Sequence, residues 1–448
     1  MMLAVGCGKQ EAGADATKAD ANTGKEAAAT TDKPADKAAG KTKIKVVYKQ
    51  VDGYKEWLEA AKAEYEKAYP DMEVELSQIS SNEGDYNTKT ALMLQTDDTV
   101  DVMVVDSFLV PSLVGPGYLK DLAVDGWADW KDQYSDSVKA GMTIDGKVYA
   151  IPYTTDTRGL YYNVEVFKKA GVETPWAPKS WDDVLKTVKK LQDAGIAYPI
   201  WMNGSKAQGE GTTMQTFEML MAGTGDWIFE DNKWVAKAPG ITDTLKFIQS
   251  VYEMGVYDNT ELGTMLDANG WQTLNVKMPE SKEVGILLDG SWKSGDWFKA
   301  LPDTAADVIK ITPLPNQKGD NFASMSGGWT LGVSALSDQA EASFNFIQAA
   351  ANKNNILSFT TKGGDMAVRK DVVSDDTYVK QNVYRAEMSK YTDFTKFRPG
   401  VELYPSISIE IQTVVEAVIT GQMTAEEAAE AYDKNVKELA GEGNWVEK

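Results

Sequence analysis

Apolar and polar positions follow two periods along the chain from Ile44 onward. Short apolar runs with strand-like composition, at 44–48, 72–76 and 101–105, alternate with segments whose apolar residues recur at helical spacing, at 54–69 and 85–95. The order strand, helix, strand, helix, strand predicts a parallel sheet that helices cover on both faces. The alternation resumes after residue 180, so the pattern predicts an α/β protein with a second lobe.

A polar segment separates two strand-like runs in the middle of the chain. Residues 148–152 and 160–162 have strand character, and Thr154, Thr155, Asp156 and Thr157 lie between them. These residues alone leave two interpretations open. The segment is either a surface hairpin with a solvated Asp156 or a crossing between two lobes with Asp156 facing the space between them.

Polar side chains follow the strands of the first unit at their carboxyl ends. Gln50 follows the first strand, Glu83 the second and Asp106 the third. Because ligands of parallel α/β sheets bind beyond the carboxyl ends of the strands, this set predicts a binding site at that edge. The alternative is that each residue caps a helix or is solvated in a loop, which explains one residue better than it explains all three.

Composition narrows the classes of function. With 448 residues, of which 43% are hydrophobic, the chain can form two cores, and no apolar run approaches a membrane span in length. The net charge of −21 argues against nucleic acid as a partner, because phosphate binding needs clustered Lys and Arg. The chain has no histidine and one cysteine, Cys7, so the usual general base, intrachain disulfides and cysteine metal clusters are excluded. We therefore expect no cofactor and no resident metal ion.

The first residues, MMLAVGC, resemble a bacterial lipobox that ends at Cys7. In such a motif the cysteine becomes the first mature residue and carries lipid. From residue 8 to residue 43 there is no Val, Ile, Leu, Met, Phe, Trp or Tyr, so this segment cannot bury enough apolar area to offset the entropy of ordering. We expect residues 1–43 to be a signal remnant and a disordered tether; the alternative is an incidental cysteine in a tail.

Several longer stretches, taken in order, resemble the maltose-binding-protein-like solute-binding proteins of bacterial ATP-driven sugar importers. They are DVMVVDSFLVPSLVGPGYLKDL at 101–122, DGKVYAIPYTTDTRGLYYNVEVFKKAG at 145–171, SWDDVLKTVKKL at 180–191, GILLDGSWKSGDW at 285–297, SGGWTLGV at 326–333, GGDMAVRKDV at 363–372 and RPGVELYPSISIEIQTVVEAVITGQMTAEEA at 398–428. The series covers essentially the whole chain after residue 43. Each stretch is weak alone, and their shared order makes the resemblance specific.

The resemblance implies a two-lobed periplasmic-binding-protein fold with a hinge and a ligand cleft between the lobes. The first lobe would be residues 44–152 with 330–375, and the second 153–329 with 376–448. The stretches 152–157 and 326–330 would be hinge crossings, and the lobes would close over the ligand. The implied function is an extracytoplasmic substrate-binding component of an ABC transporter. It would be a monomer, lipid-anchored at Cys7, that delivers a sugar to the membrane permease.

The family's ligand positions correspond to a defined set of residues in this sequence: Gln50, Glu83, Asp106, Asp156, Asn203, Asp289, Trp292, Trp329, Asp365 and Arg398. Carboxylates and amides hydrogen-bond sugar hydroxyls, and Trp faces cover apolar sugar faces. Maltose binders have an Asp-Arg pair after the third strand where this chain has Phe108 and Leu109, which puts maltose itself in doubt. Arg398 and Arg369 are the candidate cations, so we expect a neutral mono- or oligosaccharide.

Other classes of function also fit parts of the sequence. Asp106 and Asp156 are two carboxylates that a glycosidase would use as its catalytic pair. Tyr161 and Tyr162 resemble the paired tyrosines of ferric-ion binders, although core packing explains adjacent tyrosines in a strand equally well. A binding protein for a non-sugar solute is the remaining alternative.

We predict that residues 1–43 are dispensable for folding and binding, because they lack the large apolar residues that a core requires. A chain starting at Lys43 should unfold at the same temperature as the full chain and bind the same ligand. A shortened chain that fails to fold, or folds without binding, would contradict this prediction.

Overall fold

The computed structural model describes residues 41–51, 53–81, 83–255, 259–362 and 365–448. Its first large sheet has the strand order β2-β1-β3-β16-β6. Strand β1 pairs in parallel with β2 and β3, and β16 pairs antiparallel with β3 and β6. The strands are β1 (Thr42–Lys49), β2 (Met72–Ile79), β3 (Val102–Asp106), β6 (Ala150–Pro152) and β16 (Trp329–Val333).

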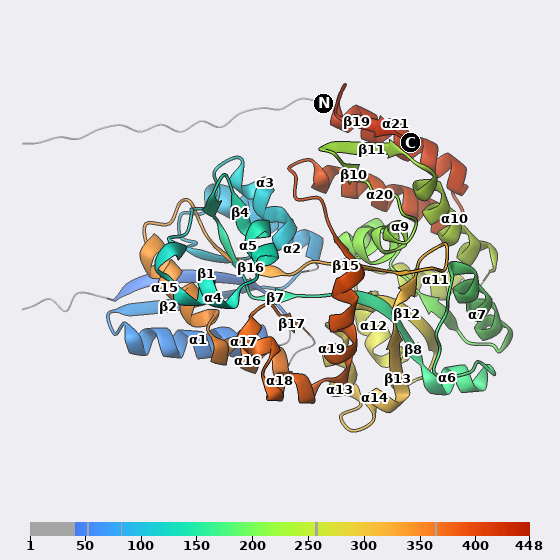
Figure 1. Ribbon diagram of the computed structural model, residues 1–448, viewed down its shortest axis with the longest axis horizontal. Helices are drawn as coiled ribbons and strands as arrows, with labels where there is room; N and C mark the ends of the chain where they lie inside the picture. Colours follow the sequence, from blue (N-terminus) through green and yellow to red (C-terminus); the bar gives the residue numbers. More distant parts are fainter. Residues whose placement is uncertain (1–40, 52, 82, 256–258, 363–364) are drawn as a thin grey trace, which may run out of the picture. The chain divides into compact units, whose positions relative to one another are not determined.

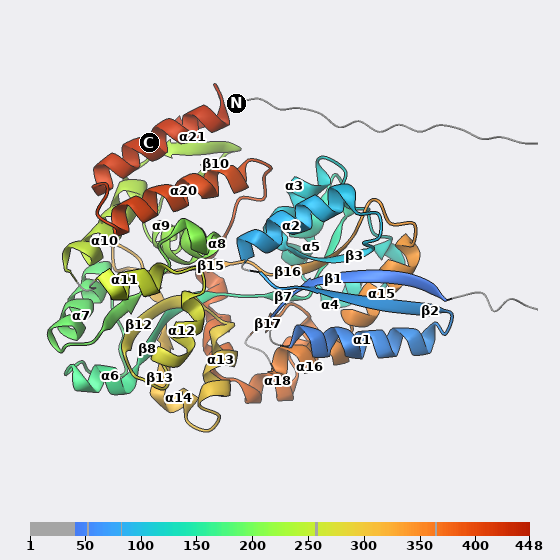
Figure 2. The same cartoon turned by 180° about the vertical axis from the view of Figure 1, so that it is seen from behind.

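Helices cover both faces of this sheet, as the alternating pattern predicted (Figure 1). On one side lie α1 (Tyr54–Ala68), α15 (Ala340–Ala350) and α16 (Lys353–Lys362), and on the other lie α2 (Glu83–Thr96) and α3 (Val110–Val114), as the reverse view in Figure 2 also shows. Trp57 anchors the first layer: its indole N–H donates to the Ala350 carbonyl at 2.8 Å and its ring stacks on Phe359 with centroids 5.0 Å apart. The helical spacing at 54–69 therefore reflects a buried helix face.

The second large sheet has the order β13-β8-β12-β9, with β13 (Ile309–Thr312), β8 (Arg158–Asn163), β12 (Val284–Gly290) and β9 (Tyr198–Trp201). Adjacent tyrosines in β8 point to opposite faces, as strand geometry requires. Tyr161 packs against Trp297 of α13 (Lys293–Ala300), and Tyr162 packs against Phe167 of α6 (Val164–Lys169). Both tyrosines are buried in aromatic cores, which favours the packing interpretation over ferric-ion binding.

Two chain segments pass from one sheet to the other. Strand β6 belongs to the first sheet and β8 to the second, so the hairpin interpretation of this stretch is wrong and the crossing interpretation holds. The return passage leads from β13 of the second sheet through β14 (Leu314–Pro315) and β15 (Phe322–Ser326), which pair with each other, into β16. Ser324 of β15 exchanges hydrogen bonds with the backbone of Arg158 at 2.9 Å each. Gly328 lies in this passage with a φ of 147°, and a Cβ there would lie 2.2 Å from the Thr154 carbonyl oxygen.

Local sequence signals correspond to two further helix starts. Ser180 caps α7 (Trp181–Asp193), and Thr424 and Glu427 form a capping box at α21 (Ala425–Ala440). A small sheet of β10 (Phe229–Glu230), β11 (Lys233–Lys237) and β19 (Trp445–Glu447) was not predicted, because its strands are short.

The remaining elements are listed in chain order: η1 (Ser107–Leu109), η2 (Val124–Gly126), α4 (Ala128–Gln133), α5 (Asp136–Met142), β4 (Thr143–Ile144), β5 (Lys147–Val148), β7 (Thr154–Thr155), η3 (Lys206–Gln208), α8 (Glu210–Thr212), η4 (Thr213–Glu218), α9 (Met219–Ala222), α10 (Pro239–Glu253), α11 (Asn259–Leu266), α12 (Gly270–Lys277), α14 (Ala305–Val308), β14 (Leu314–Pro315), β17 (Met366–Ala367), α17 (Lys370–Val373), α18 (Asp376–Gln381), α19 (Val383–Met388), η5 (Ser389–Phe394), β18 (Thr395–Phe397) and α20 (Tyr404–Ile419). Across the described ranges, no helix is both long enough and apolar enough to span a bilayer.

Arg369 should be a structural residue whose loss destabilises the fold. Its side chain is buried, pairs with Asp129 and Asp371 at 2.8 Å each, and donates to the Ala351 carbonyl. Arg369→Ala leaves these partners without their cation, so we expect a loss of about 3 kcal/mol in the free energy of unfolding. Chemical denaturation measures this loss.

The exposed ion pair between Lys380 and Asp376, 2.7 Å apart, supplies the control. Lys380→Ala should change the free energy of unfolding by less than about 1 kcal/mol, because exposed pairs contribute little. Equal effects of the two substitutions would contradict a structural role for Arg369.

Candidate functional site at the strand crossings

Arg398 joins elements of the two halves of the fold. Its Nη2 donates to Asp106 Oδ1 at 2.7 Å, at the carboxyl end of β3, and its Nη1 donates to Glu210 Oε2 at 3.1 Å, at the start of α8. The guanidinium carbon lies 3.8 Å from the centroid of the Phe108 ring. All three charged side chains are less than a tenth exposed. Two carboxylates and an aromatic face therefore surround one buried cation.

Asp156 joins the two crossing segments. Its Oδ1 accepts hydrogen bonds from the Arg158 guanidinium and, at 2.9 Å, from the Gly327 N–H. Arg158 Nη1 also donates to the Met325 carbonyl at 3.1 Å. Asp156 thus ties the first crossing to the return crossing.

The two tryptophans expected at the site each lie beside a cation. Trp329 pairs with Asp106 across β16 and β3, and Lys49 Nζ lies 4.8 Å from the centroid of its ring. Arg158 lies 4.8 Å from the centroid of the Trp292 ring. Both indoles are half-buried, so part of each remains accessible for an apolar contact.

Burial raises the pKa of two further carboxyls expected at the site. The pKa of Asp289 rises to about 6 because burial outweighs the nearby Lys293, the Gly290 N–H and Arg158. The pKa of Asp365 rises to about 7, through burial and then the charge of Asp156, against the opposing effects of Arg385 and Lys49. Both groups therefore lie in the electrostatic field of the charged residues at the crossings.

The other expected residues are less closely connected. Asn203 is half-buried and its Nδ2 donates to Gln215 Oε1 at 2.7 Å, whereas Gln50 is exposed just beyond β1. Glu83 is the first residue of α2, and its side chain lies outside the described part of the chain, as does Cys7. The structure thus connects Trp329, Asp106 and Arg398 in one set of contacts, and Asp156 with Trp292, through Arg158, in another. The charge of Arg158 acts on Asp289, and the charge of Asp156 acts on Asp365.

Comparison of the sequence with known protein families assigns the chain to one of them. The sequence model of the family of bacterial extracellular solute-binding proteins matches residues 48–355. The chain belongs to this family. Related sequences include a maltooligosaccharide ABC transporter solute-binding lipoprotein of Streptococcus pneumoniae, 26% identical over 73% of both chains, and a galactooligosaccharide-binding protein of Bacillus subtilis. The latter is 24% identical over 75% of this chain and 77% of the relative.

Solved structures show the same two-lobed fold. Maltose-bound MalE3 of T. maritima aligns with a TM-score of 0.76 at 23% identity, covering 89% of this chain and all of that one. The GacH receptor of Streptomyces glaucescens, solved unliganded and with acarbose, aligns with a TM-score of 0.77 at 20% identity, covering 89% of this chain and 98% of that one. The expectation of a two-lobed α/β fold is therefore confirmed.

In this solute-binding protein, sequence reasoning missed several charged residues of the site. Arg158 is a third arginine to consider beside Arg398 and Arg369, and it lies at the crossing, whereas Arg369 pairs elsewhere. A signal for Arg158 was present, because it stands two positions after Asp156 in an extended segment and so shares its face. Glu210 had no such signal, because its partner Arg398 is 188 positions away.

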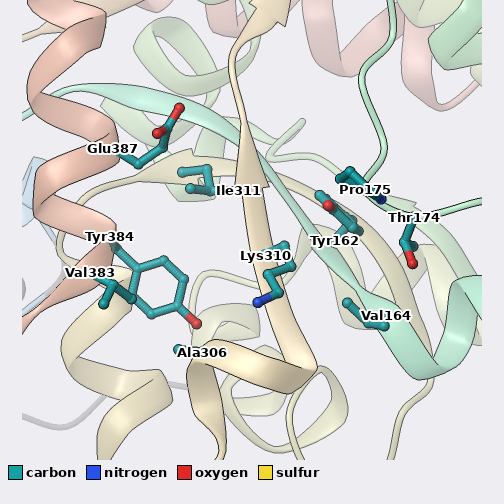
Figure 3. A pocket seen from close by; sticks show the side chains of 10 residues that line it. All are labelled: Tyr162, Val164, Thr174, Pro175, Ala306, Lys310, Ile311, Val383, Tyr384 and Glu387. Carbon is teal, nitrogen blue, oxygen red and sulfur yellow. The ribbon is translucent and has the colours of Figure 1, made fainter.

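A separate groove lies along the edge of the second sheet (Figure 3). It has a volume of about 550 Å³ between β8, β13 and α19, and none of the charged residues of the crossings lines it. Its tyrosine hydroxyls already have partners: that of Tyr384 is 2.9 Å from the Ile309 carbonyl oxygen, and that of Tyr162 accepts from the Trp176 N–H. Glu387 pairs with Lys390 at 2.7 Å. These three polar groups are therefore engaged, and Lys310 and Thr174 are the other polar side chains that line the groove.

The raised pKa of Asp289 should make stability depend on pH. A carboxyl that keeps its proton in the folded state to about pH 6, but loses it near pH 4 when unfolded, destabilises the fold as the pH rises between these values. Relative to Asp289→Asn, the wild type should lose on the order of 3 kcal/mol of unfolding free energy from pH 4 to pH 7. Urea denaturation across this range measures the difference.

Asp303→Asn, at an exposed position, is the control. Its difference from the wild type should stay nearly constant with pH. The interpretation fails if Asp289→Asn follows the wild-type curve in parallel.

Proposed function

We propose that this protein captures a neutral carbohydrate, a mono- or oligosaccharide, outside the cytoplasm and delivers it to the membrane subunits of an ABC importer. The family assignment makes it a solute-binding protein. The names of its relatives, which bind maltooligosaccharides and galactooligosaccharides, support a sugar as the solute. The observation that carries the proposal is that each crossing residue pair places a tryptophan near an acid: Trp329 pairs with Asp106 across the sheet, and Trp292 lies beside the arginine that holds Asp156.

The chemistry of this group suits hydroxyls better than charged ligands. Asp106 and Asp156 are already ion-paired with Arg398 and Arg158, so a ligand would add hydrogen bonds to existing pairs. A sugar hydroxyl both donates and accepts, and can therefore contact either member of a pair. An anionic ligand would face the carboxylates, and a cationic ligand would face the arginines.

The proposed ligand-binding residues are those expected from the sequence, with Arg158 and Glu210 added: Gln50, Glu83, Asp106, Asp156, Arg158, Asn203, Glu210, Asp289, Trp292, Trp329, Asp365 and Arg398. The proposed lobes are residues 44–152 with 330–375 and 153–329 with 376–448. Membership of β16 in the same sheet as β1 and β3 supports this division. The two crossings would serve as the hinge about which the lobes close on the ligand.

We further propose that the protein is a monomer anchored by lipid at Cys7, and that it has no enzymatic activity. A glycosidase needs one carboxylic acid that donates a proton to the leaving group. Asp106 and Asp156 are each held by a guanidinium, so neither carboxyl is free to face a leaving group. The names of the relatives, which are binding components of transporters, support the same conclusion.

A thermal-shift screen of the purified protein against neutral sugars, uronates and amino acids tests the proposal. A neutral sugar should raise the melting temperature, since a ligand that binds only the folded state stabilises it by mass action. Stabilisation by uronates or amino acids alone would instead assign a non-sugar solute. Release of reducing sugar during incubation would contradict the absence of enzymatic activity.

Trp329→Ala should weaken sugar binding by roughly 1–3 kcal/mol, because the substitution removes an aromatic surface that covers the sugar ring. Isothermal titration calorimetry measures the affinity. Trp445 offers a matched control: it is also half-buried with a lysine 4.7 Å from its ring centroid, but it lies in the small sheet of β10, β11 and β19. Trp445→Ala should leave the affinity unchanged, and an equal loss in both variants would argue against a ligand platform.

A further inference from the structure

Glu218 is a buried carboxyl next to the Arg398 cluster. It ends the π-helical segment η4 and is fully inaccessible to solvent. Its Oε1 lies 3.0 Å from the Tyr404 hydroxyl, and its Oε2 is buried with no hydrogen-bond partner among the described residues. An ionised carboxylate with one oxygen unsatisfied is costly to bury, so this environment favours the neutral acid.

A proton count at Tyr404 supports the same protonation state. The Tyr404 hydroxyl lies 3.0 Å from Glu218 Oε1 and 3.1 Å from Glu210 Oε2, and it has a single proton to donate. Glu210 is the ion-pair partner of Arg398 and also accepts from the Ser408 hydroxyl. Both contacts of Tyr404 are hydrogen bonds only if one of the two carboxyls is protonated and donates to the tyrosine oxygen. Because Glu210 is paired with Arg398, we place this proton on Glu218, and the tyrosine then donates to Glu210.

The charged and titratable groups that face Glu218 come from several elements. They are Glu210 on α8, Tyr404 on α20, Tyr432 on α21, Arg158 on β8 and Arg398 before α20. Burial and then the charge of Glu210 raise the pKa of Glu218 to about 8, against the opposing effects of Arg398, Tyr404 and Arg158. The proton is therefore held at neutral pH and lost in mildly alkaline solution.

We propose that Glu218 is a positioning residue whose proton sets the ligand affinity of the site, by keeping Arg398 shared between Glu210 and Asp106. This inference rests on the proposed function. With Glu218 neutral, Arg398 pairs with both Asp106 and Glu210, and these three side chains together carry one net negative charge. Loss of the proton adds a second negative charge beside Glu210 and removes the donor to Tyr404.

Loss of the Glu218 proton affects the ligand site through Arg398. A doubly charged pair of Glu210 and Glu218 attracts the guanidinium more strongly than Asp106 does alone. Arg398 then shifts toward the acid pair, and its contact with Asp106, which joins the end of β3 to the segment before α20, weakens. Ligand binding that relies on this contact loses affinity as the pH rises through the titration of Glu218. By linkage, a bound ligand favours the protonated form of Glu218.

The test measures the dissociation constant of the best sugar from the thermal-shift screen between pH 6.5 and pH 9.5. For the wild type, affinity should fall roughly fivefold or more across this range, the lower end of couplings between linked sites. Glu218→Gln keeps a donor for Tyr404 without a titrating proton, so its affinity should be independent of pH and close to the wild-type value at pH 6.5. Asp303→Asn, which removes an exposed carboxyl, should keep the wild-type profile.

A second measurement needs no variant. Calorimetry at pH 8 in two buffers of different ionisation enthalpy should show net proton uptake by the wild type when sugar binds. Sugar binding without proton uptake, or a Glu218→Gln protein with the wild-type pH profile, overturns this inference and leaves the proposed function intact. Failure of the wild type to bind any sugar at any pH overturns the proposed function and the inference with it.

Discussion

The burial of Arg398 is the constraint on which the crossing region depends. A guanidinium less than a tenth exposed is tolerated only with good partners, and here it has Asp106 on one side, Glu210 on the other and the Phe108 ring against it. These partners come from β3, α8 and the turn after β3. One cation therefore fixes the relative positions of three chain segments, and its removal would leave two buried carboxylates without their cation.

The paired glycines of the return crossing make this arrangement sterically possible. A Cβ at Gly327 would lie 3.1 Å from Arg398 Nη2 and 3.5 Å from Asp156 Oδ2, so a side chain here would intrude between the two ion pairs. At Gly328 a Cβ would meet the Thr154 carbonyl oxygen, and the φ of 147° is one that other residues rarely adopt. The two crossings approach each other closely because neither position has a side chain.

Local patterns account for the part of the fold that could be predicted. The helix at α1 and the capped starts of α7 and α21 depend on contacts within a few residues, and the sequence therefore carries their signals. The place of Asp106 also followed from a local rule, since it ends a buried parallel strand. The same rule succeeded less well for Gln50, which is exposed beyond its strand, because the rule places a residue at an edge without saying which way its side chain points.

Pairings between distant positions could not be predicted. Arg398 meets Asp106 across 292 positions and Glu210 across 188, and periodicity has no bearing on such separations. The contact between Trp292 and Arg158 could not be predicted either, because it depends on the direction of an arginine side chain from another strand. Sequence reasoning therefore pointed to Asp106, Asp156 and the two tryptophans, but not to Glu210 or to the cation that each acid would face.

These ion pairs change the kind of ligand that the acidic composition of the chain leads one to expect. The chain has 67 acidic and 46 basic residues, which suggests an electronegative site if the acids there are counted alone. The structure instead places each of these carboxylates beside a guanidinium, so both signs of charge are present at the crossings. A ligand of either charge would have to disrupt a buried pair, whereas a hydroxyl-bearing ligand can donate to the acid and accept from the arginine while both pairs persist. We expect selectivity among neutral ligands to depend on which hydroxyls reach these pairs and on the apolar faces of Trp292 and Trp329.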